Sequence, residues 1–260
     1  MRAVRSSLMV GVATDVRRVR AHNEDRAMAR GTVFVVADGM GGHAAGEVAS
    51  GLTVDALGDL AQRPVLAVRD IVAQVREANR RILASAARHP DQTGMGTTVA
   101  GLAVVHVGDS EHWAVFNIGD SRVYRCIDGS LTRVTVDHSE VQELVDEGFI
   151  TPDEARHHPG RNIVTRSLGR DPMGPVDTWV FPPNPGERFL LCTDGLSNEL
   201  SDEEMQEVIT GIEDAQSAGD ELLRRALEAG GRDNATAIVV GLQGQESDSG
   251  VDADTTPETP

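Results

Sequence analysis

The sequence predicts an α+β fold in which antiparallel strands outnumber helices and the helices pack outside the sheets. Nine segments rich in β-branched residues have the character of strands, and they come in consecutive groups joined by short turns. This grouping favours antiparallel pairing over a strictly alternating parallel fold. Asp128-Gly129, between two of these segments, is typical of a tight hairpin turn. The grouping alone leaves open whether the strands form two sheets or one large sheet.

Each element is placed by its pattern of apolar residues. The expected strands cover 7–16, 32–38, 97–107, 112–120, 122–127, 131–135, 177–181, 188–194 and 235–242. Helical periodicity predicts helices over 47–59, 64–88 and 139–147, and over 201–229 with a break near Gly211. In 64–88 the predicted apolar face comprises Val65, Val68, Val72, Val75, Ala78 and Ile82. The polar segment 136–170 carries little core signal, and a loop-rich segment of that length is usually functional or mobile.

Composition narrows the class of protein. The 260 residues are 40% hydrophobic and 25% charged, which is ordinary for a soluble globular protein. The formal charge of −17 argues against binding to nucleic acid or to an anionic membrane. No apolar run approaches the ~20 residues of a spanning helix, and the N-terminal residues lack the pattern of a signal peptide. We therefore expect a cytoplasmic protein.

The two cysteines and the C-terminal segment each lead to a prediction. Cys126 and Cys192 both lie in strand-like runs, so we expect buried thiols in a reducing compartment, with a disulfide as the alternative. The segment 243–260 holds five acidic residues, no basic residue and many Ser, Thr, Pro and Gly residues. Such a composition predicts a disordered acidic tail.

Acidic residues recur at strand ends or in turn-like settings. Five short pieces share this placement: Asn23-Glu24-Asp25, Asp38-Gly39, Gly119-Asp120-Ser121, Thr193-Asp194-Gly195 and Arg232-Asp233-Asn234. Any one of these aspartates could form an Asx turn or a helix N-cap. Paired strands, however, can bring several such ends to one rim, where carboxylates repel one another unless cations lie between them. Oxygen ligands alone suit Mg²⁺ and Mn²⁺, and no His/Cys spacing indicates zinc.

A carboxylate-held pair of such ions would activate water for displacement at phosphorus. Arg20, just upstream of Glu24 and Asp25, could clamp phosphate oxygens, although a surface arginine is the alternative interpretation. From the residues alone, the hypothesis is a metal-dependent phosphoester hydrolase.

Seven motifs extend this hypothesis to a family. They are "RAHNED" (20–25), "ADGMGGHAAGEVAS" (37–50), "GMGTTV" (94–99), "NIGDSRVYR" (117–125), "LVDEGFITPDEARHHPGRN" (144–162), "LLCTDGLSN" (190–198) and "RDNATAIVV" (232–240). Together they resemble the bacterial PPM-type protein phosphatases, the metal-dependent type-2C serine/threonine phosphatases, in family order over residues 8–242. The resemblance implies a four-layer α/β/β/α sandwich, in which two antiparallel sheets flanked by helices form a catalytic domain over residues 1–242.

The resemblance also implies roles for the acidic residues. Asp38 would bridge two metals, and the Gly39 carbonyl would ligate the second. Asp194 and Asp233 match the other direct ligands of the first metal. The remaining acids have weaker assignments. Glu24 and Asp25 match residues that bind the metals' waters, and Asp120 matches a ligand of a third metal.

Three further features of the family map onto this chain. Arg20 matches the arginine that holds the substrate phosphate. Residues 137–165 match a mobile flap beside the site that is implicated in substrate choice. His43 lies near the chemistry, where it could protonate the leaving alkoxide or orient its loop, and a metal-bound water could serve as the acid instead.

The activity that the resemblance implies is hydrolysis of phosphoserine and phosphothreonine on proteins by a metal-bridging hydroxide. It requires two or three Mg²⁺ or Mn²⁺ ions, and it reverses the action of a cognate serine/threonine kinase. We expect a monomer. The alternatives are a non-catalytic phosphoprotein-binding module, which loss of the matched ligands would favour, and a phosphomonoesterase of small metabolites.

Overall fold

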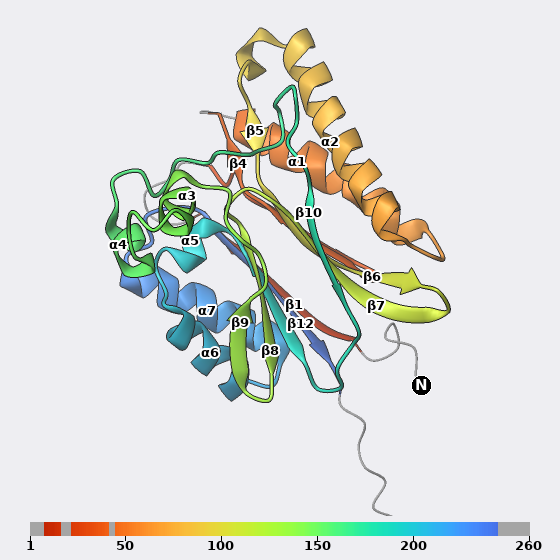
Figure 1. Cartoon of the computed structure of the whole chain (residues 1–260), viewed down its shortest axis with the longest axis vertical. Coiled ribbons are helices and arrows are strands. Elements are labelled where there is room, and N and C mark those ends of the chain that lie inside the picture. The colour runs from red at the N-terminus through yellow and green to blue at the C-terminus, as the bar shows by residue number, and fades with distance from the viewer. Residues whose placement is uncertain (1–7, 17–21, 42–44, 244–260) are drawn as a thin grey trace, which may run out of the picture.

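Two five-stranded antiparallel sheets lie face to face, with helices on both outer sides (Figure 1). This computed structural model describes residues 8–16, 22–41 and 45–243. Arg20, His43 and the expected tail from residue 244 onward lie outside the described residues. The four-layer α/β/β/α arrangement confirms the predicted fold class and decides for two sheets rather than one.

The first sheet has the strand order β1-β12-β11-β8-β9. Its strands are β1 (Leu8–Asp15), β12 (Ala235–Leu242), β11 (Arg188–Cys192), β8 (Arg122–Ile127) and β9 (Ser130–Arg133). The second sheet has the order β10-β7-β6-β3-β2. Its strands are β10 (Asp177–Phe181), β7 (Ser110–Ile118), β6 (Val99–Val107), β3 (Val33–Ala37) and β2 (Arg26–Arg30). A short ladder joins β4 (Gly39–Met40) to β5 (Gly96–Thr97).

Helices cover the outer face of each sheet. The second sheet carries α1 (Ala45–Gly58) and α2 (Val68–Arg88), with short 3-10 turns at Asp59–Gln62 and Pro90–Gln92. The first sheet carries α6 (Asp202–Gly211) and α7 (Ala215–Ala229), preceded by the single turn α5 (Asp194–Ser197). Two short helices, α3 (Glu140–Asp146) and α4 (Pro152–His157), lie beside one end of the sandwich (Figure 1).

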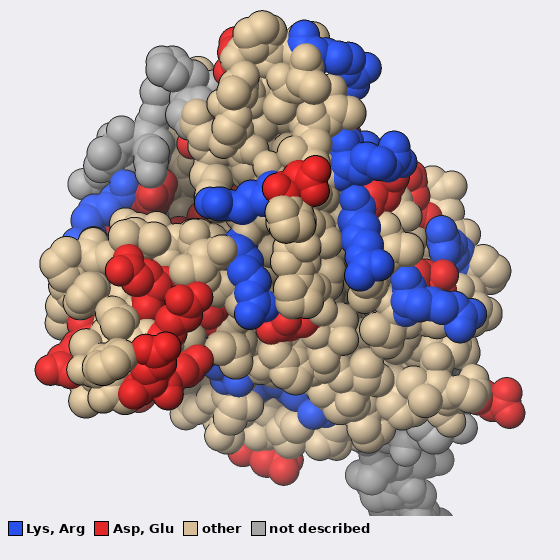
Figure 2. Space-filling view, turned by 45° about the horizontal axis from the view of Figure 1, so that its top comes forward, with Lys and Arg blue, Asp and Glu red and all other residues tan. Residues whose placement is uncertain are grey.

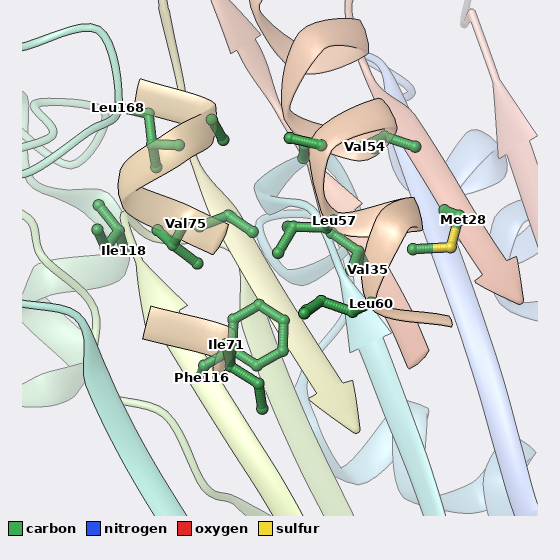
Figure 3. Close-up of a cluster of buried hydrophobic side chains, with 14 of the residues drawn as sticks. Met28, Val35, Val54, Leu57, Leu60, Ile71, Val75, Phe116, Ile118 and Leu168 are labelled. Atoms are coloured by element: carbon green, nitrogen blue, oxygen red, sulfur yellow. The ribbon is translucent and has the colours of Figure 1, made fainter. Parts of the chain in front are cut away.

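The apolar core has three layers. The inner faces of the two sheets meet around Trp113 and Phe189, whose rings contact edge to face with centroids 5.1 Å apart. A second cluster lies under α1 and α2, where Leu57 and Ile71 pack toward the sheet (Figure 3). A third lies under α6 and α7. The residues shown in Figure 3 come from the sheet, from both helices and from Leu168 of the segment after the flap.

The structure corrects the start of α2. The helix begins at Val68 and not at Pro64, because the Asp70 carboxylate accepts a hydrogen bond from the Ala67 N–H at 2.9 Å and caps it there. Val65 is consequently 57% exposed and does not belong to the buried face. Ile71 takes that place, and Val68 and Val72 lie at its margin.

Other local predictions are confirmed or extended. The Asp128-Gly129 turn joins β8 to β9 with φ angles of 50° and 79°, as a tight hairpin requires. Cys126 and Cys192 are buried free thiols. The strand β2 was not predicted, because "RAMAR" has no β-branched residue, and it lies at a sheet edge. Within the described ranges, no helix has the length and apolar character needed to cross a bilayer.

Candidate metal centre

Acidic residues from both sheets converge at one end of the sandwich. Asp38 directly follows β3 of the second sheet, and Asp194 opens α5 just after β11 of the first. Asp120 lies in the turn between β7 and β8, so it joins the two sheets. Asp233 precedes β12, and Asp25 precedes β2. Segments that are more than 200 residues apart in the sequence thus supply one site.

The backbone of Asp38 is fixed by two threonines. Its N–H donates to Thr98 Oγ1 at 3.0 Å, and its carbonyl oxygen accepts from Thr97 Oγ1 at 2.8 Å and from the Thr98 N–H at 2.9 Å. These contacts give the "GMGTTV" motif (94–99) a role in the site, because they hold the central carboxylate at the strand end.

The same threonine reaches the turn that carries Asp120. Thr98 Oγ1 and Ser121 Oγ lie 2.7 Å apart and share a hydrogen bond. Gly119 has a φ of +108°, and a Cβ there would lie 2.6 Å from the Thr98 side chain. A side chain at position 119 is therefore excluded, and the turn approaches the Asp38 loop closely.

Asp25 is buried, with 2% of its surface exposed, and only one of its oxygens has a partner. Thr193 Oγ1 donates to Oδ2 at 2.8 Å, while Oδ1 has no hydrogen-bond partner within the described residues. A buried carboxylate oxygen without a donor is costly for the folded chain. It is suited to accept from a ligand or a water held in the site.

Asp194 and Asp233 are brought together by a close approach of two backbones. A Cβ on Gly195 would lie 1.8 Å from the Asn234 carbonyl oxygen, so only glycine fits after Asp194. The Asn234 side chain accepts from the Glu24 N–H at 3.0 Å and donates to the Val16 carbonyl at 2.9 Å. Asn234 thereby ties the loop of Asp233 to the loop of Glu24 and Asp25.

Gly39 is required for a further close approach. A Cβ there would lie 2.2 Å from the Gly46 carbonyl of α1, and the Gly39 N–H donates to the Glu24 carbonyl at 3.2 Å. A Cβ at Gly46 would in turn lie 2.7 Å from Glu24 Oε1. The glycines therefore let α1, the Asp38 loop and the Glu24 loop pack against one another.

The carboxylates strongly perturb one another. Burial, together with the nearby charges of Asp194 and Asp233, raises the pKa of Asp25 to about 7. Burial, together with Asp194 and Asp137, raises the pKa of Asp120 to about 8. Burial and the charge of Asp25 raise the pKa of Asp38, which also shares a hydrogen bond with Asp194. Without a cation, the site favours protonated carboxyl groups.

Divalent cations fit this donor set. All of the groups bind metals through hard oxygen atoms, and positive charge relieves their mutual repulsion. Within the described residues, Asp25 Oδ1 also has no hydrogen-bond partner that would compete with a ligand. In the part of the chain that the structure describes, no three His, Cys, Asp or Glu side chains form a complete ligand cluster by themselves. Waters and backbone oxygens would have to complete the coordination, as is usual for Mg²⁺.

A cavity of about 750 Å³ opens from this centre toward the flap. Asp120, Asp194 and Asp233 lie at one end, and the cavity runs between α3–α4 on one side and α5–α6 on the other. Its wall includes the ion pair in which Arg122 Nη2 donates to Asp137 Oδ2 at 2.6 Å, at the base of the flap. The cavity thus leaves room for groups on either side of a ligand bound at the carboxylates.

Charge is unevenly distributed around this end of the molecule (Figure 2). Acidic side chains gather at the left of the view, the side on which Figure 1 places α3 and α4, and arginines run from the centre to the right. Exposed acids of the flap include Glu143, Asp146, Glu147, Asp153 and Glu154. Such a surface repels extended polyanions.

Every predicted acidic residue lies at this end, but the sequence prediction missed the groups that hold the acids in place. Thr98, Thr193 and Asn234 were not singled out, although Thr193 directly precedes Asp194 and Asn234 directly follows Asp233. His138 was given no role either, yet it is buried, with 5% of its surface exposed. Adjacency to the acids was the signal that could have found Thr193 and Asn234, whereas the motif of Thr98 contains no acid.

The fold and the acidic centre define a metal-dependent phosphatase-like sandwich, and comparison with known proteins specifies the family. The protein phosphatase 2C model matches residues 14–234. The chain therefore belongs to the protein phosphatase 2C family.

Individual relatives agree with this assignment. The chain is 44% identical to the serine/threonine protein phosphatase PstP of Mycobacterium tuberculosis H37Rv over 225 residues, which cover 85% of this chain and 42% of that protein. It thus spans less than half of the length of that relative. It is 36% identical to the serine/threonine phosphatase stp of Listeria monocytogenes EGD-e, covering 87% of this chain and 93% of that protein.

Solved structures show the same fold. The M. tuberculosis phosphatase PstP/Ppp superposes with a TM-score of 0.85 at 39% identity, covering 91% of this chain and 99% of that one. The catalytic domain of PstP in complex with two manganese ions superposes with a TM-score of 0.83 at 38% identity, with the same coverage.

Proposed function

We propose that this chain is a protein serine/threonine phosphatase that hydrolyses phosphoserine and phosphothreonine with the help of two or three Mn²⁺ or Mg²⁺ ions. The observation that carries the proposal is the convergence of buried, mutually repelling carboxylates from both sheets at one end of the sandwich. A relative of the same fold has been solved with two manganese ions, which supports the choice of metal.

The proposed ligands follow the geometry of the loops. Asp38, at the centre of the carboxylates, would hold the ions together with the Gly39 carbonyl, and Asp194 and Asp233 would be the other direct ligands. When bound, the ions would supply an activated water and neutralise charge on the phosphoryl oxygens. We assign the outer positions to Glu24, Asp25 and Asp120, which would orient bound waters or hold a third ion.

Two predicted residues complete the proposed mechanism. Arg20 would hold the substrate phosphate through its guanidinium group, because a planar fork of donors matches phosphate oxygens. His43 would stand close to the leaving group. An Arg20→Ala change should mainly raise KM, and a His43→Ala change should mainly lower kcat if the residue protonates the leaving oxygen.

Several features favour a protein substrate over a small metabolite. The cavity has a volume of about 750 Å³ and reaches from the carboxylates to α4 and α6, which is more space than a phosphate group alone requires. It is bounded by residues of the proposed flap, 137–165, which would contact the chain around the phosphorylated residue. We also propose that residues 1–242 form the catalytic domain, and that the protein works as a cytoplasmic monomer opposite a serine/threonine kinase.

A substrate panel tests the proposal. Phosphate release would be measured from a phosphothreonine protein, from peptides cut from it, and from small phosphomonoesters, each with Mn²⁺ and with chelator. We expect metal-dependent release with a higher kcat/KM for the protein and peptides. A preference for a small metabolite would establish the metabolite alternative, and tight phosphoprotein binding with no turnover at any metal concentration would establish the binding module.

A further inference from the structure

His138 occupies a junction that the proposed function does not explain. It follows Asp137 at the base of the flap. Its ring is buried between Gly119, in the turn that connects β7 to β8, and Asp177 of β10. The ring Nδ1 accepts from the Gly119 N–H at 3.0 Å, and the backbone N–H of His138 donates to the Gly119 carbonyl at 2.9 Å. Its carbonyl accepts from the Thr165 N–H at 2.8 Å, at the far end of the flap.

The contacts of the ring select one tautomer. The Gly119 amide can only donate, so Nδ1 must present its lone pair. A neutral ring then carries its proton on Nε2, which lies 3.1 Å from Asp177 Oδ2. Burial lowers the pKa of the ring, which agrees with a neutral imidazole. Asp177 therefore fixes the tautomer by accepting from Nε2–H, much as carboxylates orient histidines that ligate metals.

Arg166 makes this selection necessary. Its Nη1 lies 3.2 Å from His138 Nε2 and 3.3 Å from Asp177 Oδ1. A guanidinium can only donate. With Asp177 present, the arginine is satisfied by the carboxylate. Without Asp177, the same guanidinium would donate to Nε2 and favour the Nδ1–H tautomer, which opposes the Gly119 N–H.

The amide that the ring holds belongs to the turn that carries Asp120. Gly119 allows no side chain and has a φ of +108°, and Asn117 Nδ2 donates to its carbonyl at 3.1 Å. The position of Asp120 therefore depends on how the backbone at 119 is held. Arg122, two residues after Asp120, is held from the same segment as His138, because it pairs with Asp137.

We propose that His138 is a positioning residue of the metal centre: its neutral Nε2–H tautomer, set by Asp177 against Arg166, holds the Gly119–Asp120 turn in the orientation needed for cation binding. This inference rests on the proposed role of Asp120 as a metal ligand. The ring itself does not touch the substrate or the ions.

Two substitutions by amide side chains distinguish the contact of ring Nδ1 from the contact of ring Nε2. In His138→Asn, the amide oxygen can occupy the place of Nδ1 and accept from the Gly119 N–H. In His138→Gln, the longer amide reaches the place of Nε2 and keeps the contact with Asp177 but leaves the Gly119 amide without an acceptor. We expect His138→Gln to lower the affinity for the most weakly bound Mn²⁺ about 10–100-fold. His138→Asn should keep most of the wild-type affinity.

Mn²⁺ binding would be measured directly, by calorimetry and by the electron paramagnetic resonance signal of free Mn²⁺, so that the readout does not depend on turnover. The matched control is His112→Gln, because His112 lies near the end of β7 opposite to Asp120, where its Nδ1 lies 3.2 Å from the Ser110 carbonyl oxygen. His112→Gln should bind Mn²⁺ as the wild-type chain does. Equal losses in His138→Asn and His138→Gln, or no loss in either, would overturn the proposal.

The carboxylate and the guanidinium provide a second test at partly exposed positions, where folding is less at risk. Asp177→Ala should weaken Mn²⁺ binding in the same way as His138→Gln. The double variant Asp177→Ala/Arg166→Ala should recover, because nothing then forces the proton onto Nδ1. An Asp177→Ala variant with unchanged binding, or a double variant that is worse than the single one, contradicts the tautomer argument.

The tautomer can be observed without any metal. A long-range ¹H–¹⁵N spectrum of the chelated protein distinguishes bare from protonated ring nitrogens, and the signals lost in His138→Asn assign the residue. We expect Nε2–H in the wild-type chain and a shift toward Nδ1–H in Asp177→Ala. If the proposed function fails, wild-type protein releases no phosphate while these signals stay as expected; if only this inference fails, phosphate release is normal and the tautomer is wrong.

Discussion

Asp38 illustrates how a single residue combines a structural cost with a function. Its backbone is held by Thr97 and Thr98, and its carboxyl group lies against Asp194, Asp25 and Asp120. This packing of like charges destabilises the metal-free chain and prepares the site for cations. The same contacts therefore predict opposite effects of one substitution on stability and on activity.

Asp38→Asn is expected to stabilise the chelated protein and to abolish most of its activity. An amide avoids the cost of burying an acidic group among other carboxyl groups in the apo protein, so the thermal midpoint should rise by a few degrees, since roughly 1 kcal/mol shifts the midpoint of a domain of this size by about 2–4 °C. Loss of the proposed bridging ligand should lower phosphate release about 100-fold or more. Scanning calorimetry in chelator and a phosphate-release assay check the two effects, and a lower apo midpoint would contradict the account.

The pKa shifts predict how pH affects the chelated protein. The folded-state pKa values of Asp25 and Asp120, about 7 and about 8, lie above their ordinary value of 3.8. Their contribution to stability is therefore full below about pH 4 and is lost progressively as pH rises to about 8. Unfolding free energy in chelator should fall by on the order of 5 kcal/mol between about pH 5.5 and about pH 8.5.

Denaturant titrations at the two pH values measure this change, and saturating Mn²⁺ should reverse it, because the ions compete with protons for the same oxygens. Asp120→Asn should flatten the chelated profile. A chelated protein that becomes more stable toward about pH 8.5 would show that these carboxylates are not buried together.

At the residue scale, the sequence revealed the acids but not their supports. Acidic residues at strand ends stand out, because they oppose the propensity of the strand. Thr98, Thr193 and His138 do not stand out, because threonine suits a strand and a lone histidine carries no pattern. Their roles depend on contacts between distant segments, which only the folded chain shows.

At the scale of elements, glycines set how closely the loops of the site approach one another. Gly195 lets the first turn of α5 approach the loop before β12, because a Cβ would lie 1.8 Å from the Asn234 carbonyl. Gly211 ends α6 and has no neighbour within 4 Å of such a Cβ. The two positions thus form a matched pair for one substitution.

Gly195→Ala should destabilise the protein by about 3 kcal/mol or more, because the added methyl overlaps a backbone oxygen. Mn²⁺ binding should weaken with it, because the loops of Asp194 and Asp233 are forced apart. Gly211→Ala should stabilise α6 by about 0.4–1 kcal/mol and leave Mn²⁺ binding unchanged. Denaturant unfolding and Mn²⁺ calorimetry check both; equal effects of the two changes would contradict the argument from close approach.

Elements with a clear period were predictable and elements without one were not. The long strands and α3, α6 and α7 follow their sequence patterns closely. The start of α2 was misplaced by four residues, because Val65 extends the apolar pattern but lies before the cap at Asp70. The edge strand β2 and the short helix α4 carry too few apolar residues to be recognised, and their neighbours determine their structure.

At the scale of the whole molecule, the interface between the sheets holds the two halves of the site together. Asp38 belongs to one sheet, while Asp194 and Asp233 belong to the other, so their separation depends on packing around Trp113 and Phe189. Both aromatic side chains are fully buried. The sandwich therefore acts as a rigid support for the centre.

Phe189→Ala should lower stability by about 3–5 kcal/mol, because a buried ring is replaced by a cavity. Its kcat at a temperature where it stays folded should remain close to that of the wild-type chain, because the rest of the interface between the sheets still holds Asp38 at its distance from Asp194 and Asp233. Thermal unfolding and steady-state kinetics measure the two quantities. A large loss of kcat in a fully folded variant would contradict the account, because it would show that the site depends on this single ring and not on the interface as a whole.

The central claim is that the converging carboxylates bind divalent cations that carry out phosphate hydrolysis. Its most direct test is phosphate release from a phosphothreonine peptide over a Mn²⁺ titration, with wild-type protein and Asp38→Asn in parallel. We predict no release in chelator, saturable activation of the wild-type chain, and a loss of at least about 100-fold in Asp38→Asn at saturating metal. Equal rates in chelator and in Mn²⁺, or full activity of Asp38→Asn, would contradict it.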